Sequence, residues 1–337
     1  MKGRGYLTPA ELFFVRNHTS TPAIDVDDWR LRIHGDGVDH DVFLSYDDLR
    51  RLPQETIVRA LECAGNGRSV FADQHGEELD ETPWKLGAIG VAEWGGVRLS
   101  RVLDVAGLKP SARDVMPVGL DDLEVRRPLP RAKATAPDTL LALDMNGEPL
   151  LADHGFPCRV VASGWAAVAS IKWVGSIEVS CRTLLSPWNT DTYVLKGPGF
   201  EDDNPHGGSV ITMQKVKSAL ELPWPARLPQ GEHVVSGRAW SGEGSIAWVE
   251  WSDGGPWQRA TLIEPNLPAA WVRFQFVWRA RAGEHEVRTR AGDDSGAVQG
   301  DHIGWNELGY LYDAVAPHPI SVEAVCGGGV CVSQSRE

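Results

Sequence analysis

The feature that most constrains the fold of this 337-residue chain is a change in its apolar pattern near position 207. Before that point, short alternating runs such as 29–33 mix with helical spacing such as 100–108, which Gly107 would cap. After it, five alternating runs follow one another without helices, at 234–240, 246–252, 258–263, 271–279 and 284–289. The pattern predicts an α+β first part followed by a β-sandwich of immunoglobulin type.

Local patterns add detail to both parts. Ser45 and Asp48 have the capping-box arrangement that starts a helix, and alternation over 55–62 predicts a strand that ends at Cys63. In the second part, the two glycines after Asp253 predict a hairpin turn. Apolar runs predict two further strands in the first part, at 158–162 and 171–180.

We expect the division between the two parts in the polar, glycine-rich segment 201–208, which fits either a linker or an ordered surface loop. The expected domains are 1–206 and 207–322, followed by a short tail at 323–337. The tail contains Cys326 and Cys331, which would form either a metal clip or part of a frayed end.

Charge and composition exclude several classes of partner. The chain has 33 Lys+Arg and 46 Asp+Glu, for a net charge of −13, which disfavours nucleic acid and anionic membranes. No apolar run of roughly 18 residues occurs, and the first residues lack the apolar core of a secretory signal. The five cysteines include no Cys-x-x-Cys pair and argue against a disulfide framework. We therefore expect a cytoplasmic protein with no membrane and no nucleic-acid partner.

Cys63 is open to three interpretations from the residues alone. It ends the predicted strand and begins the glycine-rich turn 64–68, where Arg68 would give an exposed thiolate an electropositive setting. It could act as a nucleophile with His154 as base, bind a thiophilic or high-valent redox metal, or be a buried structural cysteine. The glycines and the cation beside it favour a functional role.

A second group of candidates consists of cations in three separate segments of this acidic chain. Such a set is expected where side chains converge on a phosphate or another small anion. Taken singly, each cation could instead form an ordinary salt bridge, so the anion-site interpretation depends on convergence. The group comprises Arg16, His18, His154, Arg159 and Lys172.

Common nucleotide-binding and hydrolase signatures are absent from the sequence. The turn 64–68 lacks the third glycine of a dinucleotide fingerprint, and no phosphate-loop lysine motif or Gly-x-Ser-x-Gly motif occurs. His285 and Glu286 have no second histidine four residues further on, which disfavours a zinc protease.

Several motifs follow one another in order along the chain, beginning with 14–18 (FVRNH) and 62–66 (ECAGN). From about residue 11 to 322 this series resembles the sulfite oxidase family of molybdopterin enzymes, and these first two segments resemble its pterin segment and its molybdenum–cysteine loop. The resemblance implies the family's mixed α/β molybdopterin-binding domain followed by an immunoglobulin-like dimerisation domain. Further matching segments lie at 84–90, 94–99, 145–150, 153–157, 170–173 and 237–242.

The resemblance also implies roles for individual side chains. Cys63 would bind molybdenum. The pterin and its phosphate would be held by Phe14, Arg16, Asn17, His18, Asp121, His154, Arg159, Ser170 and Lys172. The substrate oxyanion would be surrounded by Arg16, Arg68, Trp84 and Tyr193. The implied cofactor is therefore molybdenum-molybdopterin.

The activity implied by the resemblance is oxidation of sulfite to sulfate, with the new oxygen coming from water. Electrons would pass to an external acceptor such as a c-type cytochrome, because no haem motif is present. A homodimer is also implied. Gly67, Ala169 and Leu308 stand where many members have basic residues, so another sulfur compound, a sulfane or a sulfoxide, is the alternative substrate. The rival classes are a Cys63/His154 cysteine hydrolase and a non-enzymatic binding module.

Overall fold

The computed structural model describes residues 5–200, 204–326 and 329–330, which form two compact units. The first unit comprises Leu7–Gln214 and Gly304–Tyr312. The second contains the described residues of Met1–Tyr6, Lys215–Ile303 and Asp313–Glu337. The domain limits 1–206 and 207–322 stay a prediction. The contacts within the first unit continue past residue 206 and include a segment from much later in the sequence.

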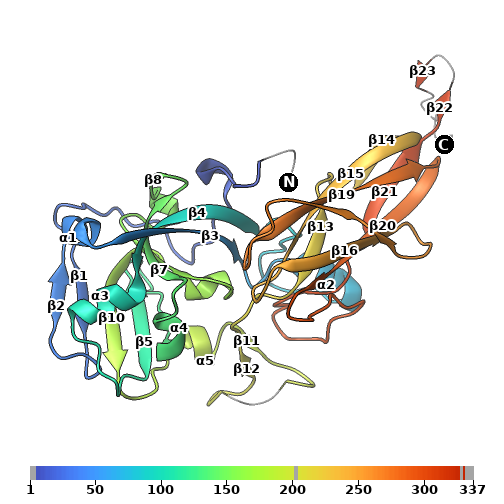
Figure 1. Ribbon diagram of the computed structural model, residues 1–337. Helices are drawn as coiled ribbons and strands as arrows, with labels where there is room; N and C mark the ends of the chain where they lie inside the picture. Colours follow the sequence, from blue (N-terminus) through green and yellow to red (C-terminus); the bar gives the residue numbers. More distant parts are fainter. Residues whose placement is uncertain (1–4, 201–203, 327–328, 331–337) are drawn as a thin grey trace. The chain divides into compact units, whose positions relative to one another are not determined.

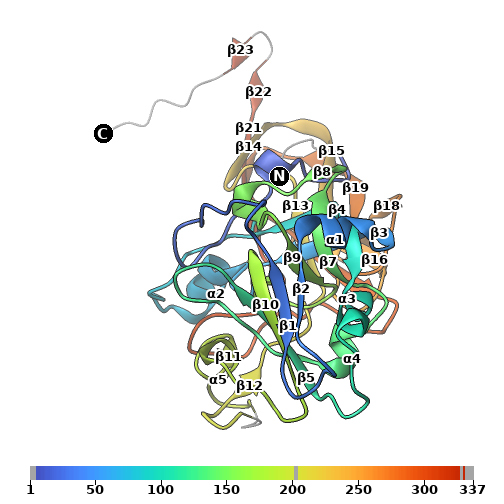
Figure 2. The ribbon, with the colours of Figure 1, turned by 90° about the vertical axis from the view of Figure 1, so that its left-hand side faces the viewer.

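The first unit contains two five-stranded sheets and a two-stranded hairpin (Figure 1). One sheet has the order β2 (Val42–Leu44), β1 (Leu31–His34), β10 (Val174–Ser180), β5 (Asp114–Gly119), β6 (Leu129–Pro130). The parallel pair β1 and β10 runs side by side in Figure 2. The other sheet has the order β3 (Gln54–Glu62), β4 (Ile89–Arg98), β7 (Thr139–Met145), β8 (Glu148–Pro149), and β9 (Arg159–Ala162) also pairs with β7.

Short helices connect these strands. The α-helices are α1 (Tyr46–Arg51), α2 (Arg68–His75), α3 (Leu99–Val105), α4 (Arg131–Ala134) and α5 (Pro187–Thr190). The 3₁₀ turns are η1 (Ala10–Leu12), η2 (Ala152–His154) and η3 (Ala167–Ala169). Residues of α3 and of both sheets form one buried apolar core, so every residue of β7 except Asp144 is buried. This core fixes the strand ends that carry the candidate site.

The local patterns in the first part are confirmed. Ser45 caps α1, with reciprocal bonds between its side chain and backbone and those of Asp48. The strand predicted at 55–62 is β3, and the glycine-rich turn after it follows Cys63. Two predicted details are wrong. The side chain of Cys63 was expected to be exposed, but it is buried, with 9% of its surface accessible. The strand predicted at 171–180 begins only at Val174, because Trp173 has a left-handed backbone with φ 54°.

The described part of the segment 201–208, residues 204–208, directly precedes β12 (Ser209–Val210), which pairs with β11 (Val194–Leu195). Asn204 is buried and donates to the carbonyl of Thr190 at 2.9 Å, while His206 pairs with Asp191 at 2.8 Å. The described residues of this segment therefore favour an ordered loop over a linker. Residues 201–203 lie outside the described part.

The second unit is a sandwich of two sheets around a shared apolar core. One sheet has the order β13 (Lys217–Leu220), β15 (Gly231–Trp240), β19 (Trp271–Ala280), β18 (Thr261–Ile263). The other has the order β14 (Ala226–Pro229), β21 (His318–Glu323), β20 (Gly283–Asp293), β16 (Ile246–Ser252), β17 (Gln258–Arg259). The hairpin after Asp253 is confirmed by the pairing of β16 with β17. The single strand predicted at 258–263 is wrong, because β17 and β18 belong to different sheets.

These features confirm the predicted class, α+β with a strand-rich second part. In the tail, β22 (Val325–Cys326) pairs with β23 (Gly329–Val330). Cys331 lies outside the described residues, so the metal clip and the frayed end both stay predictions. Among the residues that the structure describes, no helix is both long enough and apolar enough to cross a bilayer.

Candidate functional site

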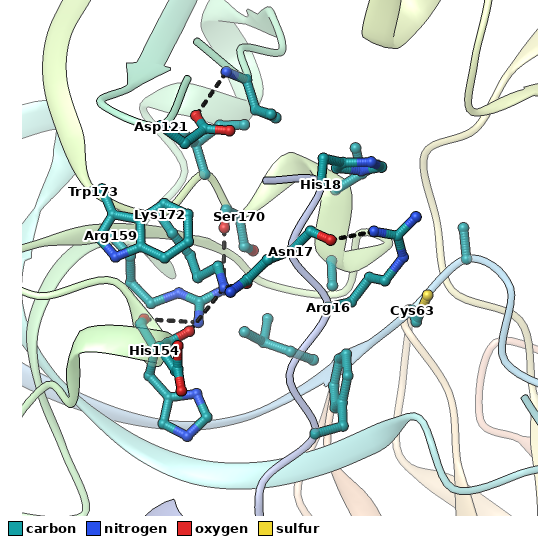
Figure 3. A pocket seen from close by; sticks show the side chains of 18 of the residues that line it. Arg16, Asn17, His18, Cys63, Asp121, His154, Arg159, Ser170, Lys172 and Trp173 are labelled. Carbon is teal, nitrogen blue, oxygen red and sulfur yellow. Dashed lines mark hydrogen bonds between the residues drawn. The ribbon is translucent and has the colours of Figure 1, made fainter. Parts of the chain in front are cut away.

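The main pocket of the first unit has a volume of about 770 Å³ measured out to its open mouth. Concave sites with apolar walls and a few convergent polar groups are the usual form of small-molecule and cofactor sites. The pocket lies where strands begin or end, because Cys63 follows β3, Asp121 follows β5, and Arg159 begins β9. Of the predicted site residues, all except Arg68 and Trp84 line it. The structure thus brings together side chains that are far apart in the sequence (Figure 3).

One side of the pocket is cationic. Arg159 is fully buried and donates to the carbonyls of His154 and Ser170, each at 3.0 Å. Its Nε is buried and has no hydrogen-bond partner among the residues that the structure describes. Lys172 lies beside it and donates to the carbonyl of Asp153 at 2.8 Å and to the side chain of Asn17. Figure 3 shows these groups on the side of the pocket opposite Cys63.

Burial and mutual repulsion lower the basicity of these cations. Burial lowers the pKa of Lys172 to about 7, and Arg159 and Arg16 lower it further while Asp153 and Asp121 oppose them. Burial alone lowers the pKa of Arg159 to about 9. The pKa of His154 is also lowered, mainly by burial. Cationic groups whose basicity is lowered in this way are expected where an anionic ligand completes the site.

Asn17, Asp121 and Ser170 connect this side of the pocket to the backbone. Arg16 donates to the carbonyl of Asn17. Asp121 accepts the backbone N–H of Val125 at 2.9 Å, and the Ser170 hydroxyl accepts that of Ala162 at 3.1 Å. Phe14 stacks on Phe13 and forms part of the apolar wall. Fixed polar groups beside an apolar wall suit a planar, partly polar ligand.

Cys63 lines the other side of the pocket. Its pKa is raised, mainly by burial, while a hydrogen bond from the backbone N–H of Gly65 and the charges of Arg68 and Arg16 oppose that rise. His154 donates or accepts at the carbonyl of Ala10, 2.7 Å away, and forms no hydrogen bond with Cys63 in the described part of the chain. The nucleophile–base pair that a hydrolase needs is therefore not formed.

Tyr193 lines the pocket within a cluster of aromatic side chains. Its hydroxyl lies 2.9 Å from Nε2 of His18, and the ring of His18 packs on Trp188 with centroids 4.3 Å apart. Burial lowers the pKa of His18 to about 4, with a further contribution from Arg16, so the imidazole is neutral at neutral pH. Burial raises the pKa of Tyr193, which is therefore a phenol. The pair presents a neutral hydroxyl to the pocket.

Arg68 and Trp84 do not line this pocket. The guanidinium of Arg68 donates to the carbonyls of Leu308 at 2.8 Å and Thr82 at 3.0 Å, and lies over the ring of Tyr310. It also packs against Gly65, within the loop that follows Cys63. Trp84 is half-buried, and its buried indole N–H has no hydrogen-bond partner in the described part of the chain. Their roles at a substrate site stay predictions.

Sequence reasoning missed Trp173 and Asp153 as pocket residues. Trp173 donates to the carbonyl of Ala152 at 2.7 Å, and the ammonium of Lys172 lies 4.3 Å from the centre of its ring. Each directly adjoins a residue that was predicted, Lys172 or His154. That adjacency was a usable signal, because the backbone turns of this segment place consecutive side chains on the same cavity.

The chain matches the family model described as an oxidoreductase molybdopterin binding domain over residues 18–188. It is 34% identical to mitochondrial sulfite oxidase of Rattus norvegicus over 95% of this chain and 62% of that protein, and 30% identical to sulfite oxidase of Arabidopsis thaliana over 91% and 86%. The chain belongs to the sulfite oxidase family. A crystal structure of the sulfane dehydrogenase SoxCD from Paracoccus pantotrophus superposes with a TM-score of 0.83 at 29% identity, over 96% of this chain and 85% of that one.

The cofactor of this family member is molybdenum-molybdopterin. The residues present fit that group, because buried cations with an unpartnered Arg159 Nε would suit its phosphate. Cys63 offers one thiolate. Among the residues that the structure describes, no three His, Cys, Asp or Glu side chains gather as a metal site, as expected for a metal that brings most of its ligands with it. The chain spans about three fifths of the length of its mammalian relatives.

The stability of the cofactor-free protein should depend on Lys172. Its pKa is about 7 in the folded protein, against an ordinary value of 10.5, so between these values the unfolded chain binds more protons. Burying the charged Lys172 ammonium destabilises the folded protein fully below pH 7, and this cost is lost as the pH rises. Stability should therefore increase between pH 7 and about pH 9. The free energy of unfolding, measured with urea at several pH values in this range, should rise less with pH in Lys172→Met than in the parent protein. An equal rise in both proteins would contradict the lowered pKa of Lys172.

Proposed function

We propose that this chain oxidises sulfite to sulfate and passes two electrons to an external acceptor. The observation that supports this most directly is a single pocket with Cys63 on one side and a buried cationic group on the other. The balanced reaction consumes sulfite and water and yields sulfate, two protons and two electrons. The cofactor supplies the two-electron redox centre for oxygen transfer to sulfur.

In this proposal the chain's own residues bind and orient. Arg159, Lys172 and Ser170, with His154, hold the phosphate of the cofactor, and Asn17 and Asp121 hold its polar edge. Arg16 reaches toward the Cys63 side of the pocket and offsets the negative charge of an incoming oxyanion. Tyr193 donates its hydroxyl hydrogen to the substrate, and neutral His18 orients that hydroxyl. Phe14 excludes water from the pterin. Arg68 and Trp84 do not line the pocket, so they would affect the substrate site by supporting the loop that follows Cys63.

A second candidate substrate is a sulfane sulfur compound. Leu308 packs against the apolar cluster that contains Ala64 and Tyr193, so it brings no positive charge to that region. The similarity to the sulfane dehydrogenase SoxCD favours the same alternative. A less charged substrate would need fewer cations around the sulfur.

The partner and location are also part of the proposal. A basic c-type cytochrome would suit the net charge of −13 as electron acceptor. A homodimer would form through the second unit, the sandwich expected to be immunoglobulin-like. The free cysteines Cys63, Cys158 and Cys181 support a reducing compartment such as the cytoplasm.

Metal analysis and a substrate screen test the proposed function. Protein purified from a host that makes the pterin should contain close to one molybdenum per chain and reduce ferricyanide when sulfite is added. Thiosulfate and other sulfane donors should be tested in parallel, with a reduced viologen as donor for sulfoxides. Less than about a tenth of an equivalent of molybdenum would refute the proposal, and activity with a sulfane donor alone would favour the second candidate.

A further inference from the structure

Tyr193 has a backbone conformation that its side chain does not favour. Its φ is 52°, in the left-handed region. A bulky residue in that region is uncommon, and it persists only where the surrounding structure holds it. Tyr193 is nevertheless buried, with its hydroxyl directed to His18 at the wall of the pocket. Some other group must therefore fix the backbone on each side of it.

Arg127 binds the backbone on both sides of Tyr193. It is 1% exposed, and its two terminal nitrogens donate to the carbonyls of Trp188 and Ile211. Trp188 lies in α5, shortly before Tyr193. Ile211 follows β12, and its own N–H donates back to the carbonyl of Tyr193 at 3.1 Å. A continuous set of hydrogen bonds therefore connects the guanidinium to the backbone of Tyr193.

Arg127 has no competing acidic partner. Within the described residues, no carboxylate lies within 4.0 Å of it. Burial lowers its pKa to about 10, so it remains charged at neutral pH, and the two carbonyls are its recorded acceptors. A planar guanidinium can bind two divergent carbonyls at once, which an ammonium cannot do with the same geometry.

Tyr310 restrains the ring of Tyr193 from the other side. The two rings stack with centroids 5.2 Å apart and planes inclined by 16°. Tyr310 belongs to the segment Gly304–Tyr312 of the first unit, and burial raises the pKa of its hydroxyl. The backbone of Tyr193 is thus held through Arg127, and its ring is held through Tyr310.

We propose that Arg127 is a positioning residue that holds Tyr193 in its left-handed conformation by binding the carbonyls of Trp188 and Ile211. The effect on the backbone is a property of the chain alone. Its consequence for turnover rests on the proposed function, in which the Tyr193 hydroxyl contacts the substrate. Loss of the two bonds should release the segment around Ile211 and displace that hydroxyl.

Amide hydrogen exchange of the cofactor-free protein tests the proposal without any activity. In Arg127→Gln, exchange of the Ile211 N–H should be faster by about tenfold or more, since its bond to Tyr193 would open more often. Arg126→Gln is the matched control, because the neighbouring Arg126 is partly exposed and, within the described part of the chain, its side chain pairs with Glu124. Exchange in that variant should equal that of the parent protein.

Turnover gives the second readout. In the loaded enzyme, Arg127→Gln should lower kcat/KM by about a hundredfold, as expected for a displaced catalytic group. In a Tyr193→Phe background, the same substitution should have little further effect, because both changes remove the same hydroxyl contact. Arg127→Lys, which retains the charge but has a single donor nitrogen, should show intermediate exchange and serves if the glutamine variant does not fold.

The outcomes distinguish the effect of Arg127 on the Tyr193 backbone from the role of Tyr193 in turnover. Parent-like exchange at Ile211 in the Arg127 variants overturns the proposal, whatever the activity. Faster exchange together with unchanged turnover supports the positioning role and contradicts the assignment of Tyr193 in the proposed function. Additive losses in the Tyr193→Phe background would show that Arg127 affects turnover by another route, and would overturn the link between these two residues.

Discussion

Cys63→Ser should abolish molybdenum-dependent turnover while the protein remains folded. A thiolate suits a high-valent redox metal, whereas a serine hydroxyl is a harder and far less acidic ligand. Loss of an outer-shell partner already costs about 10–100-fold, so loss of the ligand itself should leave less than about one hundredth of the parent activity. Steady-state sulfite oxidation with ferricyanide, together with metal analysis, measures the effect.

The fold should tolerate this change because the two side chains are nearly equal in size. Cys63 lies at a pocket wall, and the N–H of Gly65 that bonds its sulfur can donate equally to a hydroxyl. Cys181→Ser is the control, since Cys181 is a free cysteine that does not line the pocket. It should retain full activity. Turnover with normal metal content in Cys63→Ser would place the metal elsewhere, and inactivation of metal-free protein by iodoacetamide would revive the hydrolase hypothesis.

Short-range features of the fold could be predicted from the sequence. The capping box at Ser45 and the strand β3 each depend on residues within a few positions of one another. The run 258–263 could not be resolved in the same way. Its alternation is continuous, but β17 pairs with β16 and β18 pairs with β19, so the chain changes sheet at Ala260. That change is decided by partners elsewhere in the sequence.

In the candidate site, too, features that depend on nearby residues could be predicted, whereas those that depend on distant segments could not. Residues such as Arg16, Cys63 and Lys172 were placed by family motifs, and they line one pocket. No local pattern shows that they converge. Arg68 was expected at the substrate from the family resemblance, but its guanidinium donates to the carbonyl of Leu308, 240 residues away. Arg127 was not considered, because its carbonyl acceptors also come from distant segments.

Gly67→Ala should produce the largest loss of stability among substitutions in the cysteine loop. Gly67 has φ 95°, and a Cβ at this position would lie 2.7–2.9 Å from atoms of the Tyr312 side chain. Tyr312 is itself 1% exposed and cannot move aside freely. Backbone strain contributes about 1–3 kcal/mol. Overpacking contributes about another 1–3 kcal/mol. Urea unfolding of cofactor-free protein should show the sum.

Two other glycines separate these contributions. Gly76 has φ 68° and nothing within 4 Å of its Cβ position, so Gly76→Ala should show the strain alone. Gly87 also has open space and lacks the left-handed φ, so Gly87→Ala should be nearly neutral. Equal losses in Gly67→Ala and Gly76→Ala would contradict the close approach of Tyr312. If the expected order holds, Tyr312 also excludes an arginine at position 67, the basic residue that the family resemblance implied there, so this loop could not supply that charge.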